Sequence, residues 1–379
     1  MHVLLIPSFY TSPQHPYCGI FFRDQAVALQ RAGIQTGVIA PIQRSLLHVR
    51  LGQAWGTQHE DDDGVPVTRH YAPFWFPLMH RPNAKAWIRL GLRLYGRYVA
   101  THGKPDVIHA HCCLYAGELA RQIHARFDVP YVLTEHQSLH ALGPVRPWQR
   151  DMTVATLQSA AARVYVSAAL EQVMQSKYGV AASPSTVVGN PVDPLFGGSS
   201  PVPRGKRDTF RFVHVGNLVP IKRHCDLIKA FSIAFEDEAD VELRLIGSGP
   251  LRQSIESQSN RVDLVGTLNR AGVLQELQNA DALVLSSEFE TFGVALIESL
   301  ACGRPVIATR CGGPESIVQE TDGLLVEKRN PQELANAMRK LRETIDAYDP
   351  EQMRADSLRR FGEQKIVADL ASLYDSIDR

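Results

Sequence analysis

The feature that most constrains the fold is a loop and helix enclosed by two short apolar runs late in the chain. Residues 282–285 read Ala-Leu-Val-Leu, and residues 305–308 read Pro-Val-Ile-Ala. Such short runs are typical of strands buried on both faces of a parallel sheet. Between them, Val294, Ile297 and Leu300 recur at the spacing of one helical face, which predicts a helix that connects the strands. The segment therefore predicts an α/β fold.

Two glutamates flank the start of this predicted helix. Glu290 lies in the loop after the first strand, and Glu298 lies on the first turns of the helix. The backbone amides of Phe292, Gly293 and Val294 are unpaired at a helix start and carry partial positive charge, which suits phosphate oxygens. Carboxylates accept hydrogen bonds from sugar hydroxyl groups. The combination therefore indicates a ligand with both phosphate and sugar, such as a nucleotide-sugar.

This stretch resembles the donor-site signature of retaining glycosyltransferase family 4. The resemblance rests on the Glu-x7-Glu pattern of 290–298, its internal Phe-Gly pair, and the Ala-Cys-Gly-x-Pro-Val of 301–306. Two glutamates at this spacing are by themselves more often solvated residues of a surface helix, and the flanking strands and motifs make the pattern specific. The resemblance implies the GT-B fold, two facing Rossmann-like domains with parallel sheets. It also implies a nucleotide-sugar substrate, no separate cofactor and no required metal.

Composition and charge narrow the class of protein. The 379 residues are enough for two domains, and 44% apolar with 21% charged residues is typical of a soluble globular protein. Residues 1–190 hold 17 Lys and Arg against 11 Asp and Glu, whereas residues 191–379 hold 23 against 29. A basic first half favours an anionic surface or acceptor. It does not favour nucleic acid, which needs denser basic stripes.

The cysteines and the first residues bear on the compartment. The six cysteines show no Cys-x-x-Cys and no zinc-finger spacing, which favours a reduced, cytoplasmic protein. The sequence begins directly with an apolar run at 2–7 and has no basic leader and no 18-residue apolar run. We therefore expect a protein that is soluble or at most peripheral on the inner membrane leaflet.

The first half opens with the pattern of a Rossmann-like unit. A strand at 2–7, a helix that starts at Gly19 and a strand at 37–40 follow one another, without the Gly-x-Gly-x-x-Gly of a dinucleotide site. Turn geometry alone explains a glycine at a helix start equally well. In the resembled family a glycine at this place approaches the donor phosphates, and Gly19 matches it.

Polar residues follow two further predicted strands of the first half. His109 and His111 share one face of the first strand, and the second delivers Glu135 and His136 to the same edge of the sheet. A metal site would need a third ligand at a known spacing, and the sequence shows none. A polar strand end at a binding cleft is therefore the better interpretation. In the family, the histidine that closes the second strand points at the transferred sugar, which implies this role for His136.

The acidic triplet Asp61–Asp63 shares its composition with the Asp-x-Asp metal site of the other large glycosyltransferase fold. It lies in a polar, hairpin-like stretch at 58–64 and not at the end of a buried strand. We therefore interpret it as a solvated acidic loop.

The segment 73–100 predicts an amphipathic helix with a basic stripe. Four cations stand four residues apart, with large apolar residues between them and an aromatic run before them: Lys85, Arg89, Arg93 and Arg97, with Trp87, Leu90, Leu94 and Tyr98, after Phe74–Phe76. One interpretation is an ordinary surface helix of the first domain. The other is weak, salt-sensitive contact with an anionic membrane surface, which suits basic residues flanked by aromatic ones.

The second half repeats a strand–glycine pattern. Predicted strands end at Gly216, Gly247 and Gly266. In the family the backbone at such places lines the nucleotide, although turn geometry is an equal explanation. Lys222 stands at the start of the helix after Gly216, where the helix dipole disfavours a cation, and this supports a functional role.

One position of the expected diphosphate site departs from the family. Asn217 stands where the family commonly has arginine. This removes one positive charge from the site, and Arg223 is a candidate substitute.

The domain boundaries follow from these motifs and from one linker. Residues 189–193 resemble the family's hinge, and the Gly-, Ser- and Pro-rich stretch 191–207 is the predicted linker. We expect an acceptor domain at 1–190, a donor domain at 208–357, and a last helix at about 358–379 that returns to the first domain.

The residues and the resemblance together predict a retaining glycosyltransferase that moves a sugar from a UDP- or GDP-sugar to a glycan or lipid-linked acceptor. Lys222 is expected to neutralise the leaving diphosphate, Glu290 to hold the sugar, and Glu298 to bind the ribose hydroxyls. Two alternatives stay open. One is a sugar epimerase or phosphorylase of the same fold, and the other is a non-catalytic nucleotide-sugar-binding subunit. The joint presence of these residues with His136 disfavours the latter.

Overall fold

The structure of the protein is a computed structural model that describes residues 1–45, 54–74, 76, 79–179, 185–198, 200, 209–257 and 261–377. The chain divides into two compact units. The first comprises Met1–Val166, Leu170–Pro191 and Ile366–Arg379, and the second comprises Ser167–Ala169 and Val192–Lys365.

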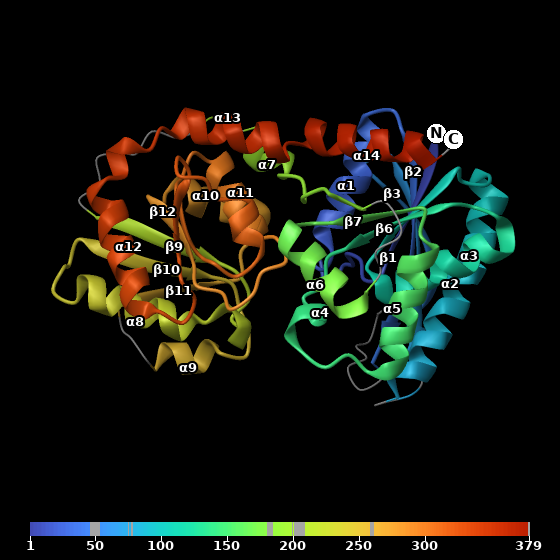
Figure 1. Cartoon of the computed structure of the whole chain (residues 1–379), viewed down its shortest axis with the longest axis horizontal. Coiled ribbons are helices and arrows are strands. Elements are labelled where there is room, and N and C mark those ends of the chain that lie inside the picture. The colour runs from blue at the N-terminus through green and yellow to red at the C-terminus, as the bar shows by residue number, and fades with distance from the viewer. Residues whose placement is uncertain are drawn as a thin grey trace. The chain divides into compact units, whose positions relative to one another are not determined.

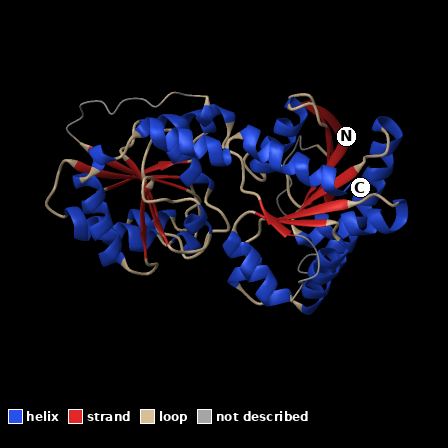
Figure 2. Cartoon of the chain, turned by 45° about the horizontal axis from the view of Figure 1, so that its top comes forward, coloured by secondary structure: helices blue, strands red, loops and turns tan. Residues whose placement is uncertain are grey.

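The first unit is built on one eight-stranded sheet with helices on both faces (Figures 1 and 2). Its described strands are β1 His2–Pro7, β2 Gln35–Arg44, β3 Gly56–Asp62, β4 Val65–Pro73, β5 Val107–His111, β6 Tyr131–Glu135, β7 Ala162–Tyr165 and β8 Ser185–Val187. Its described helices are α1 Ile20–Arg31, α2 His80–His102, α3 Glu118–Phe127, α4 Leu139–Leu142, α5 Pro147–Ser159, α6 Ala168–Tyr178 and α14 Glu363–Ile377, with a π-helical turn at Cys113–Gly117.

The strand order of this sheet is β3-β4-β2-β1-β5-β6-β7-β8. Neighbouring strands are parallel except β3 and β4, which form an antiparallel hairpin at the edge. The sheet is therefore mostly parallel, as expected, and the hairpin-like stretch expected at 58–64 forms its antiparallel edge. The physical reason is the two-residue Asp63-Gly64 turn, in which both residues have positive φ (53° and 86°). Such a turn reverses the chain directly.

Two layers of helix bury the two faces of this sheet. On one face, α1 and α14 pack against the strands through Phe22, Ala26, Ile366 and Leu370. In Figure 1 the red α14 lies beside the blue α1, although they come from opposite ends of the sequence. On the other face, α2 approaches α3 so closely that a Cβ on Gly91 would lie 2.2 Å from Leu119.

The second unit is built on a six-stranded parallel sheet of order β11-β10-β9-β12-β13-β14. Its described strands are β9 Phe210–Val215, β10 Val241–Ile246, β11 Val262–Gly266, β12 Ala282–Leu285, β13 Val306–Thr309 and β14 Gly323–Val326. Its described helices are α7 Pro194–Gly197, α8 His224–Phe235, α9 Arg252–Glu256, α10 Arg270–Gln278, α11 Val294–Ala301, α12 Pro331–Glu343 and α13 Pro350–Phe361, with 3-10 turns at Pro220–Lys222, Gly313–Ser316 and Ile345–Ala347.

The core of the second unit lies between the sheet and the pair α8 and α12. Phe231 and Phe235 of α8 and Leu334 and Met338 of α12 are buried there against strand residues such as Leu243. These helices show the expected apolar periodicity, so their formation and their burial have the same cause.

Two helices, α13 and α14, form the end of the described chain, and Gly362 lies between them. At Gly362 the backbone is extended in ψ (153°), and a Cβ there would lie 2.3 Å from the carbonyl oxygen of Leu358.

Among all the described helices, none has both the length and the apolar character needed to cross a membrane.

Candidate active site

An ion pair joins two loops at the carboxyl edge of the second unit's sheet. The Lys222 ammonium donates to Glu290 Oε1 over 2.5 Å, and Ser287 Oγ donates to the same oxygen over 2.6 Å. Both charged side chains keep some exposure, 21% for Lys222 and 12% for Glu290. Two residues chosen from sequence therefore meet, and both remain accessible to a ligand.

The backbone around Glu290 is held on both sides. Its amide donates to the Cys311 carbonyl over 3.2 Å, and its carbonyl accepts from the Gly313 amide over 2.8 Å. A Cβ on Gly313 would lie 2.1 Å from the carbonyl oxygen of Phe292. Only glycine permits this approach, which places the loop before α11.

The start of α11 has the geometry of an anion site. Gly293 is its N-cap, with φ 111°, and no side chain of the described residues caps the helix there. Phe292 is buried against the Phe361 ring, at 5.6 Å between centroids. The amides of Phe292, Gly293 and Val294 thus lie at an uncapped helix start, next to the Lys222–Glu290 pair.

Glu298 has a partner that sequence reasoning missed. Arg270, at the start of α10, has its Nη2 at 3.8 Å from Glu298 Oε1, and it also pairs with Asp193. No local sequence signal connects 270 with 298, because the contact depends on where the tertiary fold places α10 and α11. Glu298 itself is largely buried, at 8% exposure.

Three of the predicted glycines lie at the carboxyl ends of neighbouring strands. Gly247 follows β10 with φ 140°, and a Cβ there would lie 2.0 Å from the carbonyl oxygen of Gly216. The Gly247 amide donates to the Gly266 carbonyl over 2.8 Å. The backbone segments at the three glycines therefore lie next to one another at this edge of the sheet, and none of the three residues has a side chain.

The two residues of the incomplete diphosphate pattern differ in their surroundings. Asn217 is exposed in the loop after β9. Arg223 donates to Asp226 over 2.5 Å, and its Nε lies 3.9 Å from Glu288. The hydrogen bond with Asp226 and the charges of Asp226 and Glu288 raise the pKa of Arg223. The Arg223 guanidinium is thus already paired with acidic side chains.

In the first unit, Gly19 and the predicted histidines lie at the corresponding edge. Gly19 is the N-cap of α1 with φ 71°, and a Cβ there would lie 2.8 Å from the Phe9 carbonyl oxygen. His136 and His111 are joined by a 3.1 Å contact between Nε2 and Nδ1. Their environment is aromatic, since the Phe22 ring lies 4.7 Å from His111 and 5.0 Å from His136.

The histidines belong to a buried polar chain. His109 stacks on His111 at 4.3 Å between ring centroids. The Tyr374 hydroxyl lies 2.6 Å from His109 Nδ1, and Thr134 Oγ1 lies 2.6 Å from His109 Nε2. Burial lowers the pKa of His136 to about 4 and that of His109 to about 3, so both rings are neutral at pH 7.

Glu135 fixes the loop that carries His136. One carboxylate oxygen accepts from the amides of His136 and Gln137 over 2.8 and 2.7 Å, and the other accepts from the Cys113 amide over 2.8 Å. Burial acts to raise the pKa of Glu135. The charge of His140 and the hydrogen bonds with His140 and Cys113 outweigh it and hold this pKa at about 2.

The same carboxylate belongs to the group of residues, within the described chain, that could hold a metal ion. Cys113, Glu135 and His140 are buried, and their ligand atoms lie within 4.8 Å of one another. These are zinc-type ligands. The Glu135 oxygens already accept hydrogen bonds from three backbone amides and lie next to His140. These contacts explain the group as the support of the His136 loop.

The acidic triplet has a structural role, because Asp62 and Asp63 pair with Arg23 at 2.6 and 2.8 Å.

The basic stripe predicted at 73–100 lies on α2, and its four cations are exposed. The expectation that Trp87 and Tyr98 flank them on the surface is wrong, because both rings are buried. Trp87 Nε1 donates to the Pro41 carbonyl over 2.8 Å, and the Tyr98 hydroxyl lies 2.7 Å from His2 Nε2. Helical geometry turns these residues toward the sheet. Of the preceding aromatic run, Trp75 lies outside the described residues.

The chain is similar to glycosyltransferases along most of its length. Residues 209–344 match the family described as Glycosyl transferases group 1, and residues 19–195 match the one described as Glycosyltransferase Family 4. A glycosyltransferase assigned to teichuronic acid biosynthesis in Bacillus subtilis is 26% identical over 375 residues, 93% of this chain and 90% of the relative.

Solved structures share the architecture. Sucrose-phosphate synthase from Thermosynechococcus elongatus superposes with a TM-score of 0.78 at 19% identity, covering 100% of this chain and 99% of that one. Anabaena HepE in complex with UDP superposes with a TM-score of 0.71 at 20% identity, covering 99% and 100%. At this identity the likeness establishes the fold, two Rossmann-like units of the GT-B type.

Proposed function

The chain belongs to the GT-B glycosyltransferases of group 1, and we propose that it transfers a sugar, with retention of anomeric configuration, from a nucleotide-sugar to a glycan or lipid-linked acceptor. The name of the Bacillus subtilis relative assigns it to the biosynthesis of teichuronic acid. Polysaccharide synthesis at the cytoplasmic face is therefore the proposed setting, which the absence of Cys-x-x-Cys and of zinc-finger spacing among the six cysteines also suits.

The observation that carries the proposal is the Lys222–Glu290 pair beside the uncapped start of α11. A diphosphate bound there meets one ammonium group and a set of helix-start amides, all held in place before binding. The carboxylate of Glu290 keeps free acceptor capacity for sugar hydroxyl groups. Positive charge, amides and carboxylate together match a nucleotide-sugar better than they match a free nucleotide.

The remaining donor contacts follow from the same geometry. Glu298 is proposed to accept hydrogen bonds from the ribose hydroxyls, with Arg270 holding its carboxylate. The backbone at Gly216, Gly247 and Gly266 is proposed to lie against the nucleotide, since these residues have no side chain of their own. Asn217 and Arg223 are the weaker members of this set, the first uncharged and the second paired with Asp226.

In the first unit, His136 is proposed to contact the transferred sugar and Gly19 to approach the donor phosphates, the roles that the resemblance implies. A neutral, buried imidazole suits contact with a sugar, because it can donate one hydrogen bond without placing a charge near the anionic donor. His111 and Glu135 are proposed to orient it, the former through the 3.1 Å ring contact and the latter through the backbone of the His136 loop.

The proposed reaction breaks the bond between the anomeric carbon and the distal phosphate oxygen. The acceptor hydroxyl oxygen bonds to the same face of that carbon, and its proton passes to the leaving phosphate. Lys222 stabilises the charge that develops on the diphosphate, which is the task of a metal ion in other enzymes. We therefore propose that no added metal is required.

A thermal-shift screen against UDP-, GDP- and ADP-sugars tests donor binding. A donor at 100 times its dissociation constant should stabilise the protein by about 2.7 kcal/mol. Transfer to an acceptor then separates this function from the two alternatives. An epimerase changes the nucleotide-sugar without an acceptor, a phosphorylase requires phosphate, and a binding subunit releases no nucleotide. Anomeric protons in the NMR spectrum of the product report retention, and activity in EDTA reports metal independence.

A further inference from the structure

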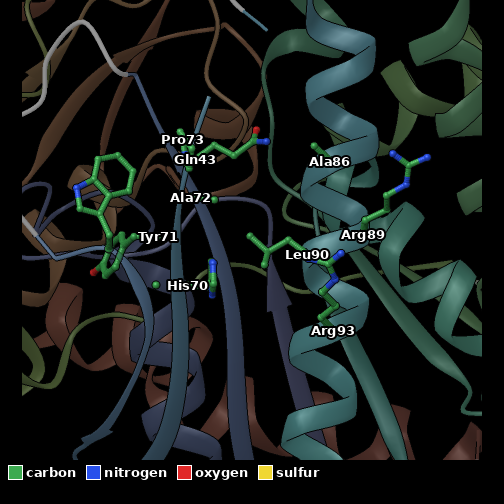
Figure 3. A pocket seen from close by; sticks show the side chains of 11 residues that line it. Gln43, His70, Tyr71, Ala72, Pro73, Ala86, Arg89, Leu90 and Arg93 are labelled. Atoms are coloured by element: carbon green, nitrogen blue, oxygen red, sulfur yellow. The ribbon is translucent and has the colours of Figure 1, made fainter. Parts of the chain in front are cut away.

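A cavity of about 450 Å³ lies within the first unit, between α2 and the carboxyl ends of β2 and β4 (Figure 3). Figure 3 shows Gln43 and His70 on the strand side, facing Leu90 and Arg93 on the helix side. A second hollow of about 310 Å³ continues along α2 and shares Arg89 with the first. Together they are large enough for one or two sugar units.

The helix side of this cavity carries uncompensated positive charge. Helix α2 contains no Asp or Glu, and its exposed cations recur every four residues, with Arg89 and Arg93 at the cavity. Within the described part of the chain, neither arginine has an ion-pair partner. Like charges four residues apart destabilise a helix. An anionic ligand would remove that repulsion.

His70 supplies a further polar group on the strand side. Arg97 Nη1 donates to Thr57 Oγ1 over 2.6 Å, and the same hydroxyl lies 2.8 Å from His70 Nδ1. With the hydroxyl as the donor in this second contact, a neutral ring carries its own proton on Nε2. Burial, together with the charges of Arg97 and Arg93, lowers the pKa of His70 and keeps the ring neutral.

An aromatic wall completes the cavity. Trp55 lines it and is 40% exposed. The residue before it is held, because Arg44 donates to the Ala54 carbonyl over 2.6 Å while its guanidinium stacks at 3.6 Å on Tyr71. An aromatic face next to arginines suits a sugar ring, whose C–H face packs on the indole while an acidic group meets the cations.

We propose that this cavity binds an acidic sugar unit of the acceptor glycan, with its carboxylate or phosphate group at Arg89 and Arg93. The inference rests on the proposed transfer to a glycan. Four strand spacings separate β4 from β6, which carries His136 at its end, and each is about 4.8 Å, or roughly 19 Å together. The bound unit is therefore an internal one, not the unit that receives the sugar.

The shape of the site favours a glycan over a membrane surface. The two arginines border a recess, and Trp87 and Tyr98 point inward, so neither ring is available as an interfacial anchor. Phe76 and Met79 are exposed near the start of α2. The test must therefore distinguish binding to lipid vesicles from binding to an acidic glycan.

The test uses the full chain and calorimetric titration with a short oligogalacturonide, the neutral galactan oligosaccharide of equal length, and inorganic phosphate. The double variant Arg89→Gln/Arg93→Gln is compared with Arg126→Gln, an exposed arginine near the end of α3. We expect salt-sensitive binding of the acidic oligosaccharide but not of the neutral one. The double variant should bind it at least about tenfold more weakly, and Arg126→Gln should bind normally.

Three results would overturn the inference. They are equal binding of the neutral oligosaccharide, unchanged binding by the double variant, and no binding of either oligogalacturonide or phosphate. Phosphatidylglycerol vesicles give a further comparison. If the wild type pellets with them and the double variant does not, while the double variant still binds oligogalacturonide as the wild type does, the arginines belong to a membrane-binding surface instead. Donor binding in the thermal-shift screen is measured on the same samples. Donor binding without binding of oligogalacturonide or phosphate rejects only this inference, and the reverse result rejects the proposed function.

Discussion

Lys222 Nζ lies 2.5 Å from Glu290 Oε1, and this pair joins the loops that follow the neighbouring strands β9 and β12. A second link runs alongside it, because Ser286 Oγ donates to the Lys222 carbonyl over 2.9 Å. A surface lysine loses side-chain entropy when it binds phosphate. The Lys222 side chain is already held by Glu290 before a ligand binds. Its attraction for a diphosphate is therefore reduced less by the entropy cost of ordering the side chain.

We expect Glu290→Gln and Lys222→Ala each to lower turnover by about 10²–10³-fold, since each removes one preorganised electrostatic contact. The fold should persist, because both side chains keep some exposure. Steady-state kinetics with the identified donor measures the loss, and circular dichroism checks the fold.

Glu320→Gln is the matched control for this pair. It makes the same chemical change at an exposed position of the second unit, and it should leave turnover unchanged. Near-normal turnover of Glu290→Gln or Lys222→Ala would remove these residues from the proposed machinery.

Asn217→Arg should tighten donor binding. Asn217 is exposed after β9, so a longer side chain needs no repacking, and a guanidinium can form a charge-assisted contact with the diphosphate. Such contacts contribute about 1.5–3 kcal/mol, or roughly tenfold or more in affinity. Calorimetric titration of the nucleotide-sugar measures the change. Asn217→Gln adds length without charge, and equal tightening in both variants would contradict an electrostatic cause.

Glu135→Gln should remove a defined part of the acid sensitivity of folding. The folded pKa of Glu135 is held at about 2, below its ordinary value of 4.5, because the His140 interactions and the Cys113 hydrogen bonds outweigh burial. A depressed carboxyl pKa stabilises the fold above the unfolded pKa and loses that effect as pH falls. The wild type should therefore lose stability from about pH 4.5 toward pH 2 more steeply than the variant.

Urea denaturation over this pH range measures the difference. Asp151→Asn is the control, since Asp151 is an exposed acid on α5 of the same unit. Equal pH slopes in the wild type and Glu135→Gln would contradict the depressed pKa.

Gly247→Ala and Gly96→Ala should change stability in opposite directions. A Cβ at position 247 would lie 2.0 Å from the Gly216 carbonyl oxygen, where φ is also positive, so the edge of the second sheet must shift. The cost should be about 1–3 kcal/mol or more. At position 96, in α2, a Cβ meets nothing within 4 Å, and alanine should stabilise the helix by about 1 kcal/mol. Melting temperatures report both, and a stabilised Gly247→Ala would show that the glycine backbone there is not needed.

Much of the fold was determined by local patterns in the sequence. Apolar periodicity predicts β1, β12 and α11 closely, because the sheet and helix periods are set by the backbone itself. The same patterns indicate that Lys222 and Glu290 follow parallel strands, and parallel strands bring their carboxyl ends to one edge. The sequence therefore assigned both residues to one donor site, whereas the hydrogen bond between them was not expected.

Only the tertiary structure decided which distant residues become partners. Arg270 meets Glu298, and Tyr374 meets His109, at separations along the chain that carry no periodic signal. The packing of α2 likewise turned Trp87 inward and left Arg93 beside a cavity. The periodicity of a helix or strand predicts which residues of that element share one face. Which element covers that face depends on strand order and helix packing, and these follow from the burial of the whole chain at once.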